Sequence, residues 1–277
     1  MCKRHRYGKG IVCVALLLFG LILSLPVPAE ELKYRASYRG IFSAGSEMAI
    51  ADVVLRNRVP SLQSAYAETG MTASSANYGY VEALYPIRYR FRSWYRRDEP
   101  GVLASEYLES GRPDDIEHKL VFLDRAEAPF VTRNIQADSH QLSRLERGKY
   151  RPRTPTGENR AFDRLGLLQH LRGQDLKPGK VVEAQVTNGS EMLFYRVKVE
   201  KAEQLTLAGT DWNALKVRLD GLETDRHGRE RHAHRPVFIW FSDDSRHLPL
   251  LAESRHQLGR FRVELVSAPA PTQVAVR

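Results

Sequence analysis

Residues 236–251 read PVFIWFSDDSRHLPLL, in which two apolar runs flank a short polar segment. Successive side chains of an extended strand point to opposite faces, so Val237 and Ile239 share one face while Phe238 and Trp240 share the other. Because both faces are apolar, both sides of the sheet must be covered at this strand. The stretch therefore predicts a sheet with a helix on one side and a curled sheet or a ligand on the other.

The polar segment SDDSRH raises the question of a catalytic cluster, because Asp243 and Asp244 lie beside Arg246 and His247. Ser and Asp side chains hydrogen-bond to their own backbone in tight turns. Adjacent residues of an extended chain also point apart, which prevents two neighbouring carboxylates from converging easily on one atom. We therefore interpret this segment as a hairpin turn.

Alternating apolar and polar residues recur along the chain, which indicates antiparallel strands with one face on a core. Examples are LKYRASYRG at 32–40, LFYRVKVE at 193–200, LKVRLD at 215–220 and RFRVEL at 260–265. About a dozen strands are expected, separated by turn-forming clusters. The predicted fold class is mainly β, a curved antiparallel sheet or half-open β-barrel wrapped around one helix.

The segment AFDRLGLLQHLRG predicts that helix, over about residues 161–172, because Leu165, Leu168 and Leu171 recur at helical spacing and Gly173 is placed to end it. A second, shorter helix is expected within residues 77–87.

The domain organisation expected from the sequence is one antiparallel β domain over residues 30–266. Within it, residues of about 135–160 are polar, basic and interrupted by prolines, which predicts a long surface crossover. Residues 267–277 have no periodicity, which predicts a disordered tail.

The first 29 residues have the pattern of a secretory signal peptide: basic residues, then an apolar run from Ile11 to Leu25, then small residues ending at Ala29. Cleavage after Ala29 would deliver the protein to the periplasm. The alternative is an uncleaved segment that anchors the protein to the inner membrane. No other contact with a membrane is expected. Both cysteines, Cys2 and Cys13, lie in this segment, so the mature chain would have no disulfide or thiolate chemistry.

The formal net charge is +9, and the signal segment carries four basic residues and no acid, which leaves +5 for the mature chain. A mildly basic exported protein needs no nucleic-acid partner to explain its charge.

A family resemblance is carried by residues 34–53, 84–95 and 176–220, and above all by VFIWFSDDSRHLPLLAESRHQLGRFRVELV at 237–266. The chain resembles an uncharacterised family of bacterial exported proteins, domain of unknown function 3108. By architecture this family resembles the half-open barrels of periplasmic lipoprotein carriers, in which a curved sheet wraps a helix around an apolar groove. The resemblance brings no set of catalytic residues with it.

Two groups of residues are candidates for ligand binding. An apolar cleft would be lined by Phe238 and Trp240, or by their opposite-facing neighbours, together with Leu168 of the helix. The segment IRYRFRSWYRR places a ladder of positive charges on one sheet face, which could hold an anionic envelope polymer or a lipid headgroup. The alternative for this ladder is a solvent face whose arginines pair with acids on neighbouring strands. Its candidate residues are Arg88, Arg90, Arg92 and Trp94.

The segment DRHGRERHAH contains the best metal candidates, His227, His232 and His234, but three arginines within it and Arg235 directly after it would repel a cation. We expect a solvated hairpin tip with no metal, and no other cofactor is indicated because the chain has no phosphate-binding glycine loop.

No catalytic motif is evident either. Ser190 lies in a predicted hairpin turn, and Asp114 with Asp115 forms a second acidic pair in a turn.

The predicted function is therefore non-enzymatic binding of an apolar or amphipathic component of the cell envelope. An envelope-assembly scaffold that docks through the basic sheet face is the alternative, and an envelope hydrolase is a third class. The sequence predicts no oligomeric state.

Overall fold

The computed structural model describes residues 30–268, apart from 61–63, 98–100, 113–114, 124–130, 152–160, 188, 190 and 225–226. The predicted signal peptide, nearly all of the predicted tail, Asp114 and Ser190 lie outside the described residues.

Fifteen strands make up most of the described part of the chain. The first seven are β1 (Glu30–Gly40), β2 (Glu47–Arg58), β3 (Tyr66–Ser74), β4 (Arg88–Arg96), β5 (Val102–Arg112), β6 (Asp115–Phe122) and β7 (Val131–Asn134). The others are β8 (Ala161–Asp163), β9 (Val181–Thr187), β10 (Met192–Leu207), β11 (Thr210–Thr224), β12 (Glu230–His232), β13 (Val237–Ser242), β14 (Pro249–His256) and β15 (Gly259–Ser267). The helices are α1 (Gly79–Leu84), α2 (Ile135–Glu146) and α3 (Arg164–Arg172), with a 3-10 turn η1 (Ile41–Ser43).

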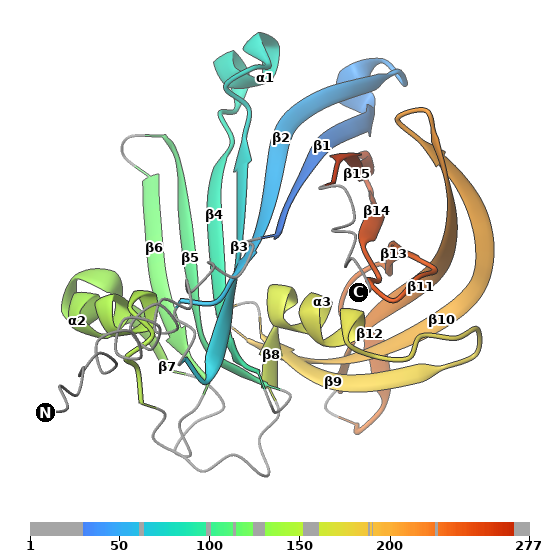
Figure 1. The fold of residues 1–277 in the computed structure, drawn as a ribbon. Coiled ribbons are helices and arrows are strands. Elements are labelled where there is room, and N and C mark those ends of the chain that lie inside the picture. Colours follow the sequence, from blue (N-terminus) through green and yellow to red (C-terminus); the bar gives the residue numbers. More distant parts are fainter. Residues whose placement is uncertain are drawn as a thin grey trace, which may run out of the picture.

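All strands belong to one sheet, in the order β7-β6-β5-β4-β3-β2-β1-β15-β14-β13-β11-β10-β9-β8, with β12 paired to β11. Neighbours in this order are antiparallel, except β8 and β9, which are parallel. The order begins at β7 and ends at β8, so the sheet is not closed into a barrel. Figure 1 shows it curving around α3, which confirms the predicted fold class.

The helices occupy different places on this sheet. α3 packs inside the curve, against β3, β4, β8 and β9, while α2 packs against β6 and β7. α1, the second helix expected from the sequence, lies at one end of the sheet near β4 (Figure 1). No helix among the described residues is long and apolar enough to span a membrane.

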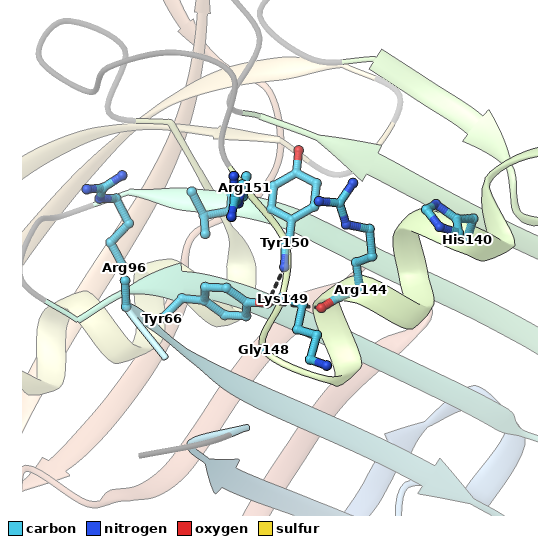
Figure 2. Close-up of a pocket in the computed structure, with 10 residues that line it drawn as sticks. Tyr66, Arg96, His140, Arg144, Gly148, Lys149, Tyr150 and Arg151 are labelled. Atoms are coloured by element: carbon cyan, nitrogen blue, oxygen red, sulfur yellow. Dashed lines mark hydrogen bonds between the residues drawn. The ribbon is translucent and has the colours of Figure 1, made fainter. Parts of the chain in front are cut away.

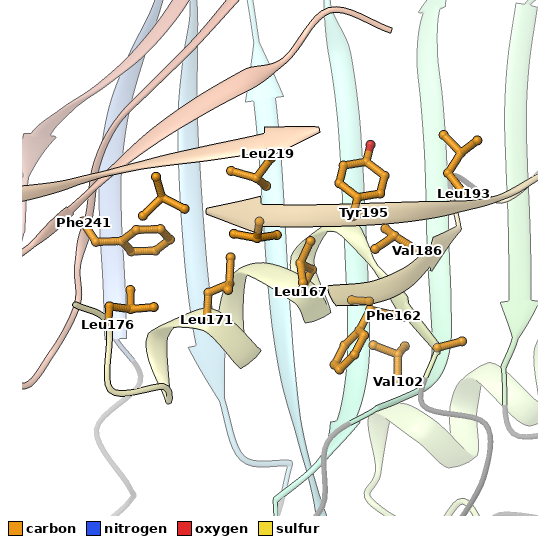
Figure 3. Close-up of a cluster of buried hydrophobic side chains, with 14 of the residues drawn as sticks. Val102, Phe162, Leu167, Leu171, Leu176, Val186, Leu193, Tyr195, Leu219 and Phe241 are labelled. Atoms are coloured by element: carbon orange, nitrogen blue, oxygen red, sulfur yellow. The ribbon is translucent and has the colours of Figure 1, made fainter. Parts of the chain in front are cut away.

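The main core lies between α3 and the inner face of the sheet, and we call it the inner core (Figure 3). Leu167 and Leu171 of α3 contribute to it and are 2% and 0% exposed. Burial of one such side chain stabilises the fold by about 1.5–3 kcal/mol. Strand side chains of the inner core include Val121, Val186, Tyr195, Val197, Val217 and Phe241.

Helix α3 begins at Arg164, three residues later than the sequence predicts, because residues 161–163 pair with β9 as strand β8. Asp163 is the N-cap, and its carboxylate accepts a hydrogen bond of 2.6 Å from the backbone N–H of Gly166. Gly173 is the C-cap, as predicted.

The SDDSRH segment forms the turn between β13 and β14, which confirms its interpretation. Asp244 accepts hydrogen bonds from the Ser242 hydroxyl at 2.7 Å and from the backbone N–H of Arg246 at 3.0 Å. Its other oxygen pairs with the Arg246 guanidinium. These contacts hold Asp244 within the turn, although both Asp243 and Asp244 are exposed.

The predicted crossover of about 135–160 is wrong at its start, where α2 forms, and its residues 152–160 lie outside the described part. Leu145 of α2 is fully buried against the outer face of the sheet, with Trp94 and Phe122 in the same cluster, and Leu142 packs against that cluster. The segment has few apolar residues among many polar ones, which is a composition typical of a surface connection.

Candidate functional site

Two cavities open on the inner face of the sheet, beside the first residues of α3. The larger has a volume of about 730 Å³ and lies toward β10, β11, β13 and β14, and the smaller, of about 360 Å³, lies toward β3 to β6. Arg164 lines both. Volumes of this size suit a small organic ligand, for which sites of about 300–1,000 Å³ are usual.

Apolar side chains form the floor of the larger cavity. They come from α3 and from three strands, and they are Leu167, Leu219, Val237, Ile239 and Phe261. Nitrogen-bearing side chains line the rest, namely Arg164, His234, Arg235, Arg255, His256 and Gln257. None of the residues lining this cavity is acidic. The cavity therefore combines an apolar floor with a cationic rim.

A hydrogen-bonded pair fixes part of this rim. The Tyr195 hydroxyl lies 2.9 Å from Nε2 of His234, whose Nδ1 lies 2.8 Å from the carbonyl oxygen of Arg235. Gly221, which pairs with Tyr195 across the strands, makes room for the imidazole, since a Cβ there would lie 2.4 Å from Nε2. Burial raises the pKa of the Tyr195 hydroxyl, and the positive charge of Arg164 offsets only part of this effect.

Arg164 is held at the centre of the site by the start of α3. Asp163 before it is buried and accepts hydrogen bonds from the Ser105 hydroxyl and the Gly166 backbone. Burial raises the pKa of this carboxyl above its usual value, although those hydrogen bonds act in the opposite direction. Arg164 itself is exposed, and no carboxylate within the described ranges forms an ion pair with it. It is therefore available to an anionic group of a ligand.

The smaller cavity is more mixed in character. Met71, Phe91 and Tyr107 contribute apolar and aromatic surface, while the ion pair of Glu117 with Lys119 adds charge. The hydroxyl of Tyr107 is buried and has no hydrogen-bond partner in the described part of the chain. Such a hydroxyl can donate a hydrogen bond to a ligand oxygen.

Of the residues predicted to line the cleft, Phe238 and Trp240 lie on the opposite face of the sheet. Trp240 pairs with Lys216 across the strands, while the next pair, Leu215 with Phe241, points into the inner core. Lys216 Nζ lies 4.4 Å from the Phe238 ring centroid and 5.5 Å from that of Trp240, and the Trp240 indole donates to Glu203 at 2.7 Å. Their opposite-facing neighbours Val237 and Ile239 line the larger cavity instead.

Leu168, the third predicted residue of the cleft, is half-buried on α3. It packs against the inner core and against a second buried cluster that includes residues of β1 and β2. It does not line either cavity.

The predicted basic ladder lies on the outer face of β4, where its arginines have acidic partners. Arg88 pairs with Glu82, and both Arg90 and Arg92 pair with Glu106, which is fully buried. The Arg92 guanidinium also lies 5.1 Å from the ring centroid of Trp94, which is fully buried. The contacts of Arg90 and Arg92 match the alternative in which the ladder pairs with a neighbouring strand, whereas Arg88 pairs with α1.

The three candidate metal ligands have separate surroundings. His227 is exposed, His232 lies 3.5 Å from Asp220, and His234 contacts Tyr195. No group of three or more His, Cys, Asp or Glu residues in the described ranges is arranged to hold a metal ion.

Sequence reasoning missed Arg164 and Arg235 as parts of one site. Each is a charged residue next to an apolar segment, which is a common surface pattern. Only the folded sheet brings the start of α3 and the start of β13 to the same cavity.

The fold and the open cavity define a class of β-barrel-like protein with a curved sheet around a helix. A crystal structure of a β-barrel-like protein of domain of unknown function DUF1849 from Brucella abortus has this fold, with a TM-score of 0.52 and 8% sequence identity. The match covers 89% of this chain and 99% of that chain.

Residues 136–266 match the family described as protein of unknown function (DUF3108), which confirms the predicted resemblance for this part of the chain. No curated protein gives a significant match.

Two further structures align with this chain over most of their length, with lower TM-scores. One is a protein described as exported, with a YmcC-like fold, from Bacteroides fragilis, at 6% identity, TM-score 0.33 and coverage of 87% and 95% of the two chains. The other is described as a lipoprotein from Parabacteroides distasonis, at 8% identity, TM-score 0.30 and coverage of 88% and 97%.

Proposed function

We propose that this protein binds an anionic amphiphile non-covalently in the larger cavity of the inner face. The observation that carries this proposal is the apolar floor beneath a rim of positive and neutral nitrogen-bearing side chains with no acid among them. Apolar surface can bury a chain or ring, at about 0.8 kcal/mol for each methylene removed from water. Arg164 and Arg235 can pair with a carboxylate or phosphate.

The proposed location is the cell envelope, and the basic and apolar segment before Glu30 supports it as a signal for export. An amphiphile of the envelope, such as a free fatty acid or a lipid, is then the ligand class available to the cavity. The arginines of the basic ladder already form ion pairs within the protein, which favours binding in the cavity over docking through the ladder.

Titration with an environment-sensitive fluorescent fatty acid tests the proposal. The wild-type protein should bind the probe saturably, and an unlabelled long-chain fatty acid should displace it. Ile239→Gln, on the cavity floor, should weaken binding by about tenfold, which corresponds to roughly 1.4 kcal/mol. Phe238→Gln is the matched control, because this neighbour lies on the same strand but faces away from the cavity.

A second variant tests the charged rim. Arg164→Gln should weaken binding of the fatty acid but leave binding of its uncharged methyl ester nearly unchanged. Binding that does not saturate, or that Ile239→Gln and Phe238→Gln weaken equally in folded proteins, would contradict the proposal.

A further inference from the structure

A separate cavity of about 710 Å³ lies on the outer face of the sheet, where the residues following α2 pass near β3 and β4 (Figure 2). We call it the outer basic pocket. It contacts the outer cluster around Trp94 and Leu145, on the opposite face from the proposed amphiphile site. Its chemistry is therefore independent of that function.

Basic side chains reach this pocket from three segments of the chain. Arg96 comes from the end of β4, His140 and Arg144 from α2, and Lys149 and Arg151 from the turn that follows. None of the ten lining residues is acidic. Figure 2 shows the guanidinium groups of Arg96, Arg144 and Arg151 on the same side of the pocket as Tyr150.

Buried contacts fix the segment that carries these charges. The Tyr66 hydroxyl donates to the carbonyl oxygen of Leu145 at 3.1 Å and accepts a hydrogen bond of 3.1 Å from the backbone N–H of Tyr150. Gly148, with a φ of +68°, turns the chain after α2, and its N–H donates to the Leu145 carbonyl at 3.0 Å. Leu145 and Tyr150 are 0% and 7% exposed. The arginines thus project from a well-anchored backbone.

The negative end of the α2 dipole explains part of this charge, since cations are favoured near a helix C-terminus. The dipole does not explain why Arg96, which comes from a strand, lines the same pocket. Arg147 lies at the same helix end, but its side chain bonds back to the carbonyl of Ser143 and does not line the pocket. Within the described ranges, no carboxylate forms an ion pair with Arg144 or Arg151.

We propose that the outer basic pocket binds a phosphate-bearing group through Arg96, Arg144 and Arg151. Planar guanidinium groups bind phosphate oxygens through paired hydrogen bonds, and several arginines that line one concave surface suit a group that carries two negative charges. The Tyr150 ring and the aliphatic stems of the arginines provide surface for the part of the ligand that carries the phosphate. Free phosphate compounds and phosphate monoesters on lipids share this chemistry.

Calorimetric titration of the full exported protein with pyrophosphate tests the site. We expect one saturable site whose affinity falls as salt is raised. Arg144→Gln should lower the affinity for pyrophosphate by about tenfold or more, because it removes at least one hydrogen bond between charged groups. Arg147→Gln, the same charge change at the same helix end, should alter it less than about twofold. Arg151→Gln is a second variant, and thermal unfolding of each protein checks that it is folded.

Cosedimentation with phosphatidylcholine vesicles, with and without phosphatidic acid, distinguishes the source of the phosphate. Pyrophosphate binding that depends on Arg144 would indicate that the pocket binds free phosphate compounds. Binding only to vesicles that contain phosphatidic acid, again dependent on Arg144, would indicate that the pocket binds a lipid headgroup. The proposal is overturned if neither probe binds above the level of the phosphatidylcholine control, or if Arg144→Gln and Arg147→Gln weaken binding equally.

Discussion

Replacement of Glu106 by Gln probes a charged network on the outer face that is centred on a buried carboxylate. Glu106 is fully buried, and its carboxylate pairs with Arg92, Arg90 and His118. Arg92 also pairs with Glu146 at 2.8 Å, which links α2 to the sheet. Removal of one partner from a buried ion pair usually costs about 3–5 kcal/mol. The lower end of that range, about 3 kcal/mol, is expected here, because Arg92 keeps Glu146 and Arg90 is 42% exposed to water.

Urea unfolding followed by tryptophan fluorescence measures this cost, and Trp94 beneath Arg92 reports on the network directly. A loss of about 3 kcal/mol corresponds to a decrease in Tm of roughly 6–12 °C for a domain of this size. Glu117→Gln on the neighbouring strand is the control, since Glu117 is 55% exposed and its loss should cost less than about 0.5 kcal/mol.

The pH dependence provides a second measurement of the same network. Burial alone would raise the pKa of Glu106, but its hydrogen bond and charge interaction with Arg92, aided by His118 and Arg90, lower the pKa below its usual value of 4.5. A lowered pKa in the folded protein stabilises it above the pKa of the unfolded chain, and this contribution is lost as the pH falls below 4.5. The variant should therefore lose stability less steeply on acidification. Unchanged urea stability at pH 7, or an unchanged acid response, would refute this reasoning.

Three further predictions concern single side chains. Gly221→Ala should cost about 1–3 kcal/mol in urea unfolding, because its Cβ would displace His234, and the cost should shrink in a His234→Ala background. Asp163→Asn keeps a cap for α3 but removes a carboxyl whose pKa is raised by burial. Such a carboxyl makes the folded protein less stable as the pH rises above about 4, because it then ionises more readily in the unfolded chain. Above this pH the variant should therefore lose less stability than the wild-type protein. Asp244→Ala should cost about 1–2 kcal/mol in thermal unfolding, since it removes two hydrogen bonds of the β13–β14 turn, whereas Asp243→Ala should be nearly neutral.

The sequence by itself determined which side chains share a face of a strand. Alternation placed Arg88, Arg90 and Arg92 together on one face of β4, and in β13 it separated Ile239 from Trp240. Turn chemistry likewise predicted the β13–β14 turn. These features depend on neighbours within a few residues, so a local pattern contains the information for them.

Only the tertiary structure decided which face of each strand meets α3 and which strands pair across long distances. β1 pairs with β15 and joins the two halves of the sheet, and the Tyr34 hydroxyl reaches the Pro249 carbonyl at 2.9 Å. The curvature of the sheet around α3 brings Arg164 and Arg235 to one cavity (Figure 1). Periodicity fixes the faces of a strand but neither its partner nor its register, since both depend on the simultaneous burial of apolar surface from distant parts of the chain.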